Sequence, residues 1–165
     1  MNDWAQRVAV ITGAGAGIGR AGAKRVLERG GRVVAVDLEG ADFAWLGALD
    51  TDGMRTRVVQ GDVTLETTNA AAVAAARSLG GLNALFLNAG LPASGTLESI
   101  DMVTFDRVLA VNLRAVVLGV RAALPALREA DRPSVVVTAS VSGLGGDPGL
   151  WAYNTAKGGV VNFVR

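Results

Sequence analysis

The chain has 165 residues, half of them hydrophobic and 19% charged, so we expect a single globular domain, residues 1–165, around one core. A net charge of +1 gives no reason to expect nucleic acid or an anionic membrane as a partner. The sequence contains neither cysteine nor histidine, which excludes disulfides, thiol catalysis and the commonest transition-metal ligands, and we expect no metal site.

Short β-branched runs alternate with longer helical segments along the chain. We expect strands at residues 7–12, 32–36, 56–60, 82–87 and 134–138. We expect helices at residues 17–29, 41–49, 65–79, 101–129 and 151–165, with a bend at Pro125 in the fourth. Strands that are apolar on both faces and alternate with helices indicate an α/β fold with a parallel sheet covered on both sides.

Neither the N-terminal segment nor the most apolar segment shows the pattern of a signal peptide or a membrane span. Residues 1–6 are short and polar, without the pattern of a signal peptide. The longest apolar candidate, residues 103–127, is interrupted by charged and amide side chains, so we expect no membrane span. These features favour a cytoplasmic protein.

A glycine-rich segment follows the first expected strand and opens the first expected helix. It runs from Thr12 through Gly13, Gly17, Ile18 and Gly19, with the spacing T-G-x-x-x-G-x-G. In this context backbone N–H groups and the helix dipole favour an anion, and glycine lets a pyrophosphate approach the backbone. We expect Gly13, Gly17, Ile18 and Gly19 to hold the phosphates of a dinucleotide. The alternative is that the segment is a flexible turn.

Asp37 ends the second expected strand, beyond the glycine segment. A carboxylate at this position can accept hydrogen bonds from the ribose hydroxyls of adenosine, and it would repel a 2′-phosphate. The glycine segment contains no lysine or arginine to bind such a phosphate. NAD is therefore favoured over NADP as the cofactor, the alternative being that Asp37 is a solvated loop residue.

Two polar turns follow the third and fourth expected strands. Asp62 and Val63 follow the third, and Asn88, Ala89 and Gly90 follow the fourth. Ligands bind sheets of this kind at the carboxyl ends of the strands. We expect both turns to contact the cofactor, although each could equally be an ordinary turn.

Asn112 lies on an otherwise apolar stripe of the expected helix at residues 101–129. A buried amide needs hydrogen-bond partners. It could be a structural asparagine bonded to the backbone. The functional alternative is that it holds a water molecule that links Lys157 to solvent as a proton outlet.

Tyr153 and Lys157 are four residues apart on the last expected helix and so share one face. The ammonium group would favour the phenolate form of the tyrosine, which could then act as a general acid and base. Ser140, after the fifth expected strand, could hydrogen-bond a substrate carbonyl or alcohol. A tyrosine–lysine pair alone is usually surface decoration, but the glycine segment and Ser140 make a coincidence improbable.

Taken in chain order, the motifs are Thr12-Gly13-x-x-x-Gly17-Ile18-Gly19, Asp62, Asn88-Ala89-Gly90, Asn112, Ser140 and Tyr153-x-x-x-Lys157. They resemble the short-chain dehydrogenase/reductase family over essentially the whole chain. The resemblance implies a Rossmann-type, doubly wound sheet with strand order 3-2-1-4-5. It also implies an NAD(P)-dependent interconversion of a secondary alcohol and a ketone.

The same resemblance assigns a role to each catalytic candidate. Tyr153 would exchange the proton with the substrate oxygen, and Lys157 would bind the nicotinamide ribose. Ser140 would orient the substrate, and Asn112 would support the proton relay. Members of the family are usually dimers or tetramers, so a homo-oligomer is expected. The alternative is an NAD-binding module or fragment without catalytic activity.

The sequence departs from the family pattern in two places. Leu87 stands where many members have an asparagine, a tolerated variation. Members also continue for roughly another half of this length, so we expect the C-terminal strands to be missing. The apolar strand at 135–137, suited to burial on both faces, would then form an exposed edge.

Overall fold

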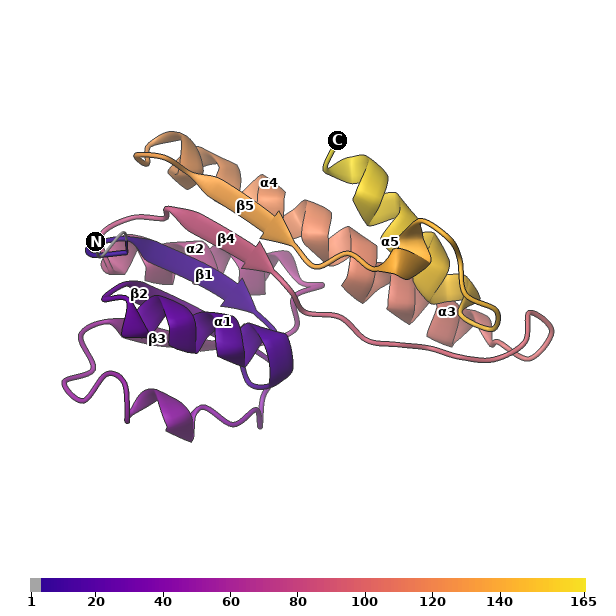
Figure 1. Ribbon diagram of the computed structural model, residues 1–165, viewed down its shortest axis with the longest axis horizontal. Coiled ribbons are helices and arrows are strands. Elements are labelled where there is room, and N and C mark those ends of the chain that lie inside the picture. Colours follow the sequence, from indigo (N-terminus) through magenta and orange to yellow (C-terminus); the bar gives the residue numbers. More distant parts are fainter. Residues whose placement is uncertain (1–3) are drawn as a thin grey trace.

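The computed structural model describes residues 4–165 and shows one five-stranded parallel sheet (Figure 1). Residues 1–3, part of the polar segment at 1–6, lie outside the described residues. The strands are β1 (Val8–Thr12), β2 (Arg32–Asp37), β3 (Thr56–Gln60), β4 (Ala84–Leu87) and β5 (Ser134–Val137). Their order, β3-β2-β1-β4-β5, confirms the predicted doubly wound fold.

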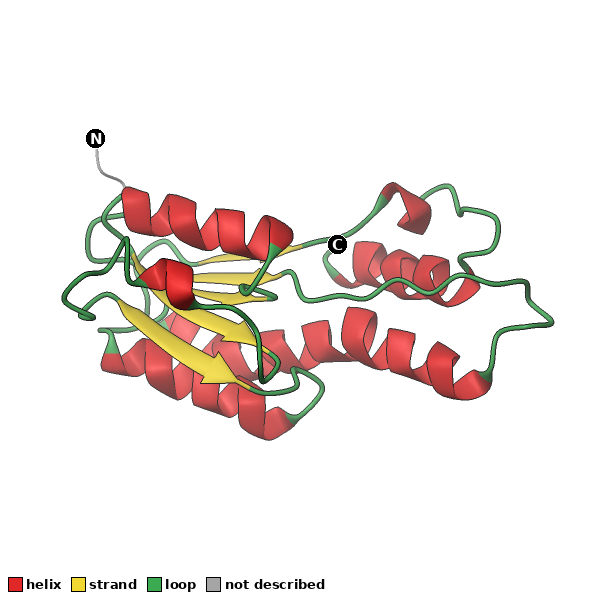
Figure 2. Ribbon diagram, turned by 90° about the horizontal axis from the view of Figure 1, so that it is seen from below, coloured by secondary structure: helices red, strands yellow, loops and turns green. Residues whose placement is uncertain are grey.

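Helices cover both faces of the sheet, as Figure 2 shows. The helix α1 (Gly17–Glu28) packs on one face, and α2 (Glu66–Ser78) and α4 (Ala115–Arg128) pack on the other. Successive strand residues point to opposite faces, so Val8 and Val10 join the core under α2 and α4, whereas Ala9 and Ile11 join the core under α1. The central strands are buried on both sides, which explains their continuous apolar runs.

Two expected helices differ from the structure. The segment at 41–49 forms only a single 3-10 turn, η1 (Ala44–Leu46), because Phe43 and Trp45 pack against the core under α1 and fix an irregular path. The helix expected at 101–129 is α3 (Met102–Leu109), a π-helical turn η2 (Ala110–Arg114) and α4. The helix changes its hydrogen-bond pattern at η2, and Pro125 sits inside α4.

The continuous helix from Met102 to Arg128 also bears on the membrane prediction. Its 27 residues are long and apolar enough to cross a membrane by length and composition, which differs from the prediction for that segment. In the fold its apolar side packs against α2 and the sheet, and 44% of its most apolar window is buried. That packing is typical of the core helix of a globular domain.

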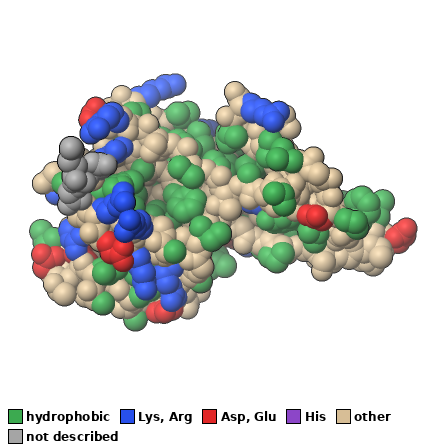
Figure 3. Space-filling view, in the orientation of Figure 1, with side chains coloured by type: hydrophobic (Ala, Val, Ile, Leu, Met, Phe, Trp, Pro, Cys, Tyr) green, Lys and Arg blue, Asp and Glu red, His purple; other side chains and the backbone are tan. Residues whose placement is uncertain are grey.

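β5 forms one edge of the sheet in the described part of the chain. It pairs with β4, and Val136, in register with Phe86, is 55% exposed. Figure 1 shows α1 over β1 and β2, with β4 and β5 open on that side, and Figure 3 shows hydrophobic side chains there. This exposed apolar edge is as expected from the sequence.

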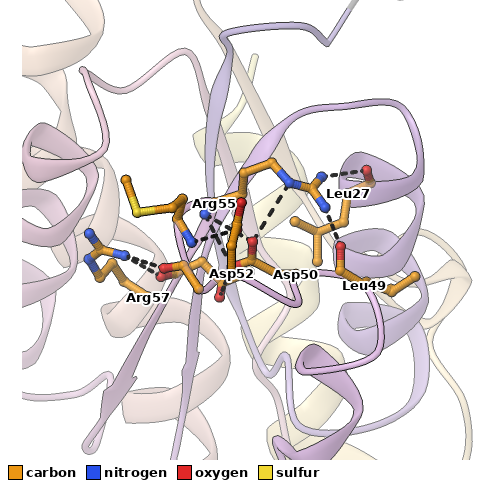
Figure 4. A network of polar contacts seen from close by, with 9 residues as sticks. Leu27, Leu49, Asp50, Asp52, Arg55 and Arg57 are labelled. Atoms are coloured by element: carbon orange, nitrogen blue, oxygen red, sulfur yellow. Dashed lines mark hydrogen bonds and ion pairs between the residues drawn. The ribbon is translucent and has the colours of Figure 1, made fainter.

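At the amino ends of the strands, a polar network joins three elements (Figure 4). The Asp50 side chain is fully buried and accepts hydrogen bonds from the backbone N–H of Arg55 (3.1 Å to each oxygen) and from Thr56 Oγ1 (2.6 Å). The Arg55 side chain donates in turn to the carbonyls of Leu27 and Leu49. This network ties the loop before β3 to the end of α1.

Candidate functional site

The glycine segment forms the turn between β1 and α1. Gly13 and Gly17 have φ angles of 68° and 51°, a left-handed conformation that side chains disfavour. Gly19 is buried beneath the turn, where a Cβ atom would lie 2.1 Å from the Gly13 carbonyl oxygen. The N-cap residue of α1, Ala16, provides no side-chain cap, so the first N–H groups of the helix are open to an anion. This backbone cradle fits a pyrophosphate.

Asp37 stands at the carboxyl end of β2 and braces the same turn. Its Oδ2 accepts a hydrogen bond from Gly15 N, and its Oδ1 accepts one from Leu38 N, both at 2.8 Å. An ionised carboxylate has about four acceptor positions, so each oxygen can still accept a hydroxyl group. The structure therefore places Asp37 where sequence reasoning expected it, beside the phosphate cradle.

Threonine and asparagine side chains join the carboxyl ends of β1, β4 and β5. Thr12 Oγ1 accepts from the backbone N–H groups of Asn88 (3.0 Å) and Ala89 (3.1 Å). Thr138 Oγ1 donates to Asn88 Oδ1 at 2.9 Å. These bonds fix the turn after β4 against its neighbouring strands and set the floor of the site.

Asp62, after β3, is held from two sides. Its Oδ1 accepts from Thr64 N (2.9 Å) and Thr64 Oγ1 (2.8 Å), and its Oδ2 pairs with Arg107 Nη1 at 2.9 Å. Burial raises the pKa of Asp62, but the hydrogen bonds from Thr64 and Arg107 outweigh burial and hold that pKa below its ordinary value. The carboxylate is therefore ionised at neutral pH.

These elements enclose a cleft of about 500 Å³ at the carboxyl ends of the strands. The expected residues that line it are Gly13, Gly17, Ile18, Asp37, Asp62, Val63, Asn88, Ala89, Gly90, Asn112, Tyr153 and Lys157. Gly19 and Ser140 do not line it: Gly19 lies under the turn, and Ser140 is the N-cap of the 3-10 turn η3 (Val141–Gly143). Residues far apart in sequence thus meet in one hollow.

Asn112 is fully buried within the π-helical turn η2. Its Nδ2 donates to the carbonyls of Leu91 (2.8 Å) and Val108 (3.1 Å), which is the structural role. Its Oδ1 is buried without a hydrogen-bond partner among the described residues, and a Cβ atom on Gly90 would lie 2.7 Å from it. An unsatisfied buried acceptor is rare in proteins and suits a bound donor such as water.

The helix α5 (Trp151–Phe163) carries Tyr153 and Lys157 on the face toward the cleft. Lys157 is 3% exposed, and its Nζ lies 5.6 Å from the centre of the Tyr153 ring and donates to the Thr138 carbonyl at 2.6 Å. Burial lowers the pKa of Lys157. Ser140 Oγ donates to Ser142 Oγ at 3.1 Å, and Ser140 does not line the cleft.

A family model described as short chain dehydrogenase matches residues 7–165. The chain belongs to the short-chain dehydrogenase family. It is 36% identical to 2-(S)-hydroxypropyl-CoM dehydrogenase 3 of Xanthobacter autotrophicus, covering 99% of this chain and 65% of that protein. It is 38% identical to cis-4-hydroxycyclohexanecarboxylate dehydrogenase of Sinomonas cyclohexanicum, covering 98% and 66%. The chain thus spans about two thirds of the length of these curated relatives.

Solved structures of short-chain dehydrogenases share the fold. A short-chain dehydrogenase/reductase from Burkholderia phymatum, crystallised in complex with NAD, superposes with a TM-score of 0.91 at 35% identity. The match covers 99% of this chain and 59% of that one. Levodione reductase superposes with a TM-score of 0.86 at 34% identity, covering 98% and 65%.

Two residues with polar side chains that line the cleft, Arg107 and Thr138, were not predicted from the sequence. Arg107 lies on α3 and reaches the Asp62 carboxylate, and Thr138 accepts from Lys157 through its carbonyl. Neither belongs to a short motif, and each acts across a large sequence separation. The position of Thr138 directly after an apolar strand was the available signal, because strand ends line such sites.

Proposed function

We propose that the protein is an NAD-dependent oxidoreductase that interconverts a secondary alcohol and a ketone. One observation carries the proposal: a single cleft brings the glycine turn and Asp37 together with Tyr153 and Lys157. A dinucleotide-binding region that adjoins an acid–base pair supports hydride transfer beside proton transfer. When bound, the nicotinamide accepts or donates the hydride.

The residues of the chain would handle the proton. In alcohol oxidation Tyr153 removes the hydroxyl proton while the carbinol carbon loses its hydride, which leaves a ketone. In the reverse direction Tyr153 returns that proton to the carbonyl oxygen. Lys157, whose Nζ lies 5.6 Å from the centre of the Tyr153 ring, would bind the nicotinamide ribose, and Ser140 would orient the substrate oxygen. Asn112 Oδ1 would hold a water molecule in the proton outlet.

The preference for NAD rests on the charges beside the turn. Asp37 accepts from Gly15 N next to the cradle and would repel a 2′-phosphate. Arg20, at the start of α1, donates to the Gly15 carbonyl and pairs with Asp42 at 3.0 Å, so its charge is already compensated. A preference for NAD over NADP favours alcohol oxidation as the direction of the reaction.

The substrate class follows the relatives. The named relatives are dehydrogenases of hydroxylated compounds, and levodione reductase is named for a ketone. We propose that this protein acts on the substrate class that these relatives share, a secondary alcohol or its ketone. We further propose a cytoplasmic homodimer or homotetramer without nucleic-acid or membrane partners, as in the family expectation.

Titration of the purified chain with NADH and with NADPH tests the proposal, after size exclusion has shown soluble protein. Saturable binding with NADH preferred is expected, followed by NADH formation from NAD and secondary alcohols. Equal affinity for NADPH would contradict the role of Asp37. Binding without turnover would favour the alternative, an NAD-binding module that lacks catalytic activity.

A further inference from the structure

Three arginines stand seven residues apart along the continuous helix formed by α3, η2 and α4, and each contacts the segment that follows β3. Seven residues make about two helical turns, so the three share one side of the helix. The contacts are Arg107 Nη1 to Asp62 Oδ2 (2.9 Å), Arg114 Nη1 to the Thr64 carbonyl (3.0 Å) and Arg121 Nη2 to Glu66 Oε1 (2.7 Å).

The ion pair of Arg107 with Asp62 differs from that of Arg121 with Glu66 in its burial and in its position relative to the cleft. Arg107 and Asp62 both line the cleft, and their side chains are 44% and 26% exposed. Arg121 and Glu66 do not line it, and both side chains are 64% exposed. An exposed ion pair on the surface contributes little to the free energy of folding or of ligand binding. A partly buried ion pair at a binding site can hold a side chain in the orientation that a ligand requires.

The position of Asp62 relative to Asp37 indicates which part of the cofactor it meets. Gly61 N donates to the Asp37 carbonyl at 2.8 Å, so the turn after β3 lies beside the end of β2. With the adenosine ribose at Asp37, the adenine base would extend toward Leu38, Asp62 and Val63, which all line the cleft. A carboxylate there can accept a hydrogen bond from the exocyclic amino group of adenine.

The ion pair with Arg107 sets the orientation of Asp62 Oδ2. Thr64 holds Oδ1 through two hydrogen bonds, and the contact with Arg107 holds Oδ2. We propose that Arg107 is a positioning residue for the cofactor: by pairing with Asp62 it orients the carboxylate that receives the adenine amino group. The inference rests on the proposed function, because it requires that a dinucleotide occupies the cleft.

Fragments of the cofactor separate this role from a general effect on folding. The full chain and its variants are titrated by calorimetry with NADH, with ADP-ribose, which keeps adenine, and with reduced nicotinamide mononucleotide, which lacks it. For Arg107→Ala we expect about fivefold weaker binding of NADH and of ADP-ribose, with unchanged binding of the mononucleotide. Arg121→Ala, the matched control on the same helix, should bind all three like the wild type.

A double-mutant cycle then tests the pairing itself. If Arg107 acts through Asp62, Arg107→Ala should weaken ADP-ribose binding no further once Asp62→Ala is present. Should Arg107→Ala fail to fold, Arg107→Lys, which keeps the charge without the planar fork, carries the test with a smaller loss for the same two ligands.

The outcomes distinguish this inference from the function on which it rests. Equal loss for all three ligands, no loss for ADP-ribose, or additive losses in the double variant would overturn the role of Arg107 while leaving the cofactor assignment intact. A wild-type chain that binds none of the three ligands would contradict the proposed function and this inference together.

Discussion

Buried charged side chains have different surroundings at the two ends of the sheet. At the amino ends, Asp50 is surrounded by donors from Arg55 and Thr56, and these hydrogen bonds outweigh burial to hold its pKa below the ordinary value. At the carboxyl ends, Lys157 is buried with one hydrogen bond, to Thr138, and burial lowers its pKa. Nearby, Asn112 Oδ1 has no partner among the described residues.

This difference separates a structural network from a functional site. A fully satisfied network stabilises the fold, because each buried polar group has replaced the water it lost. A site that must bind a ligand keeps groups that are incompletely satisfied until the ligand arrives. The following variants are arranged from the largest expected effect to the smallest, and each asks whether the two ends really differ in this way.

Tyr153→Phe should have the largest effect. It removes the hydroxyl that we propose exchanges a proton with the substrate, and turnover should fall by about 10²–10⁴-fold. Binding of NADH should change little, because the ring that packs beside Lys157 remains. Steady-state kinetics with a secondary alcohol, together with NADH titration, measures both. Turnover close to the wild-type value would remove Tyr153 from the role of proton donor.

Asp50→Ala should mainly reduce stability. The change leaves the Arg55 backbone N–H and Thr56 without their acceptor, and we expect a loss of about 2–4 kcal/mol in the free energy of unfolding. Asp131→Ala, at a carboxylate that is 82% exposed, is the control, with a change below about 0.5 kcal/mol. Urea denaturation gives both values, and similar losses in the two variants would refute the structural role of the network.

The pH dependence of the Asp50 contribution has a definite sign. The folded-state pKa of Asp50 lies below its ordinary value of 3.8, so the folded chain releases this proton more readily than the unfolded chain. The stabilisation is present above pH 3.8 and is lost as the pH falls through the folded-state pKa. The wild type and Asp50→Ala should therefore converge in stability in strong acid.

Asp37→Ala should change the preference for NADH over NADPH more than it changes the stability of the fold. Loss of the carboxylate removes its repulsion of a 2′-phosphate, and the ratio of the Kd for NADPH to the Kd for NADH should fall about tenfold. The ratio is the useful quantity, because the loss of the hydrogen bond from Gly15 N weakens both ligands alike. Glu39→Ala, at an exposed carboxylate two residues away, should leave the ratio unchanged. An unchanged ratio in Asp37→Ala as well would count against Asp37.

Lys157→Met should have the smallest effect on stability, with the sign opposite to that of Asp50→Ala. Because the folded-state pKa of Lys157 lies below 10.5, the unfolded chain holds the proton more tightly, and the free energy of unfolding rises with pH across that window. Removing the charge at pH 7 should leave stability unchanged or raise it by up to about 1 kcal/mol, although turnover is lost. Denaturation at pH 7 and at pH 10.5, the ordinary pKa of lysine, should show a smaller stability gain for the variant at the higher pH. A clear loss of stability at pH 7 would contradict the comparison.

Much of the fold was predictable because its signals are local. The apolar runs and the glycine punctuation gave five strands within a few residues, and the resemblance gave their order. The π-helical turn at Ala110–Arg114, which contains the buried Asn112, was not predicted, because the helical spacing of apolar residues does not distinguish it from the α-helices on either side. The single turn at Ala44–Leu46 likewise reflects tertiary packing that overrides local pattern.

Within the candidate site, motif residues were easier to predict than their supports. Twelve of the fourteen site residues expected from the sequence line the cleft, since strand ends and the glycine turn fix where they lie. Arg107 was missed because its contact with Asp62 joins two segments whose separation only the folded chain determines.

Hydrogen exchange with and without NADH tests the contrast between the two ends most directly. We predict slower exchange on NADH binding in the glycine turn at 13–19 and in the turns at 61–64 and 88–91, with no change in the Asp50–Arg55 segment. Protection confined to the amino ends of the strands, or no protection at saturating NADH, would contradict the account.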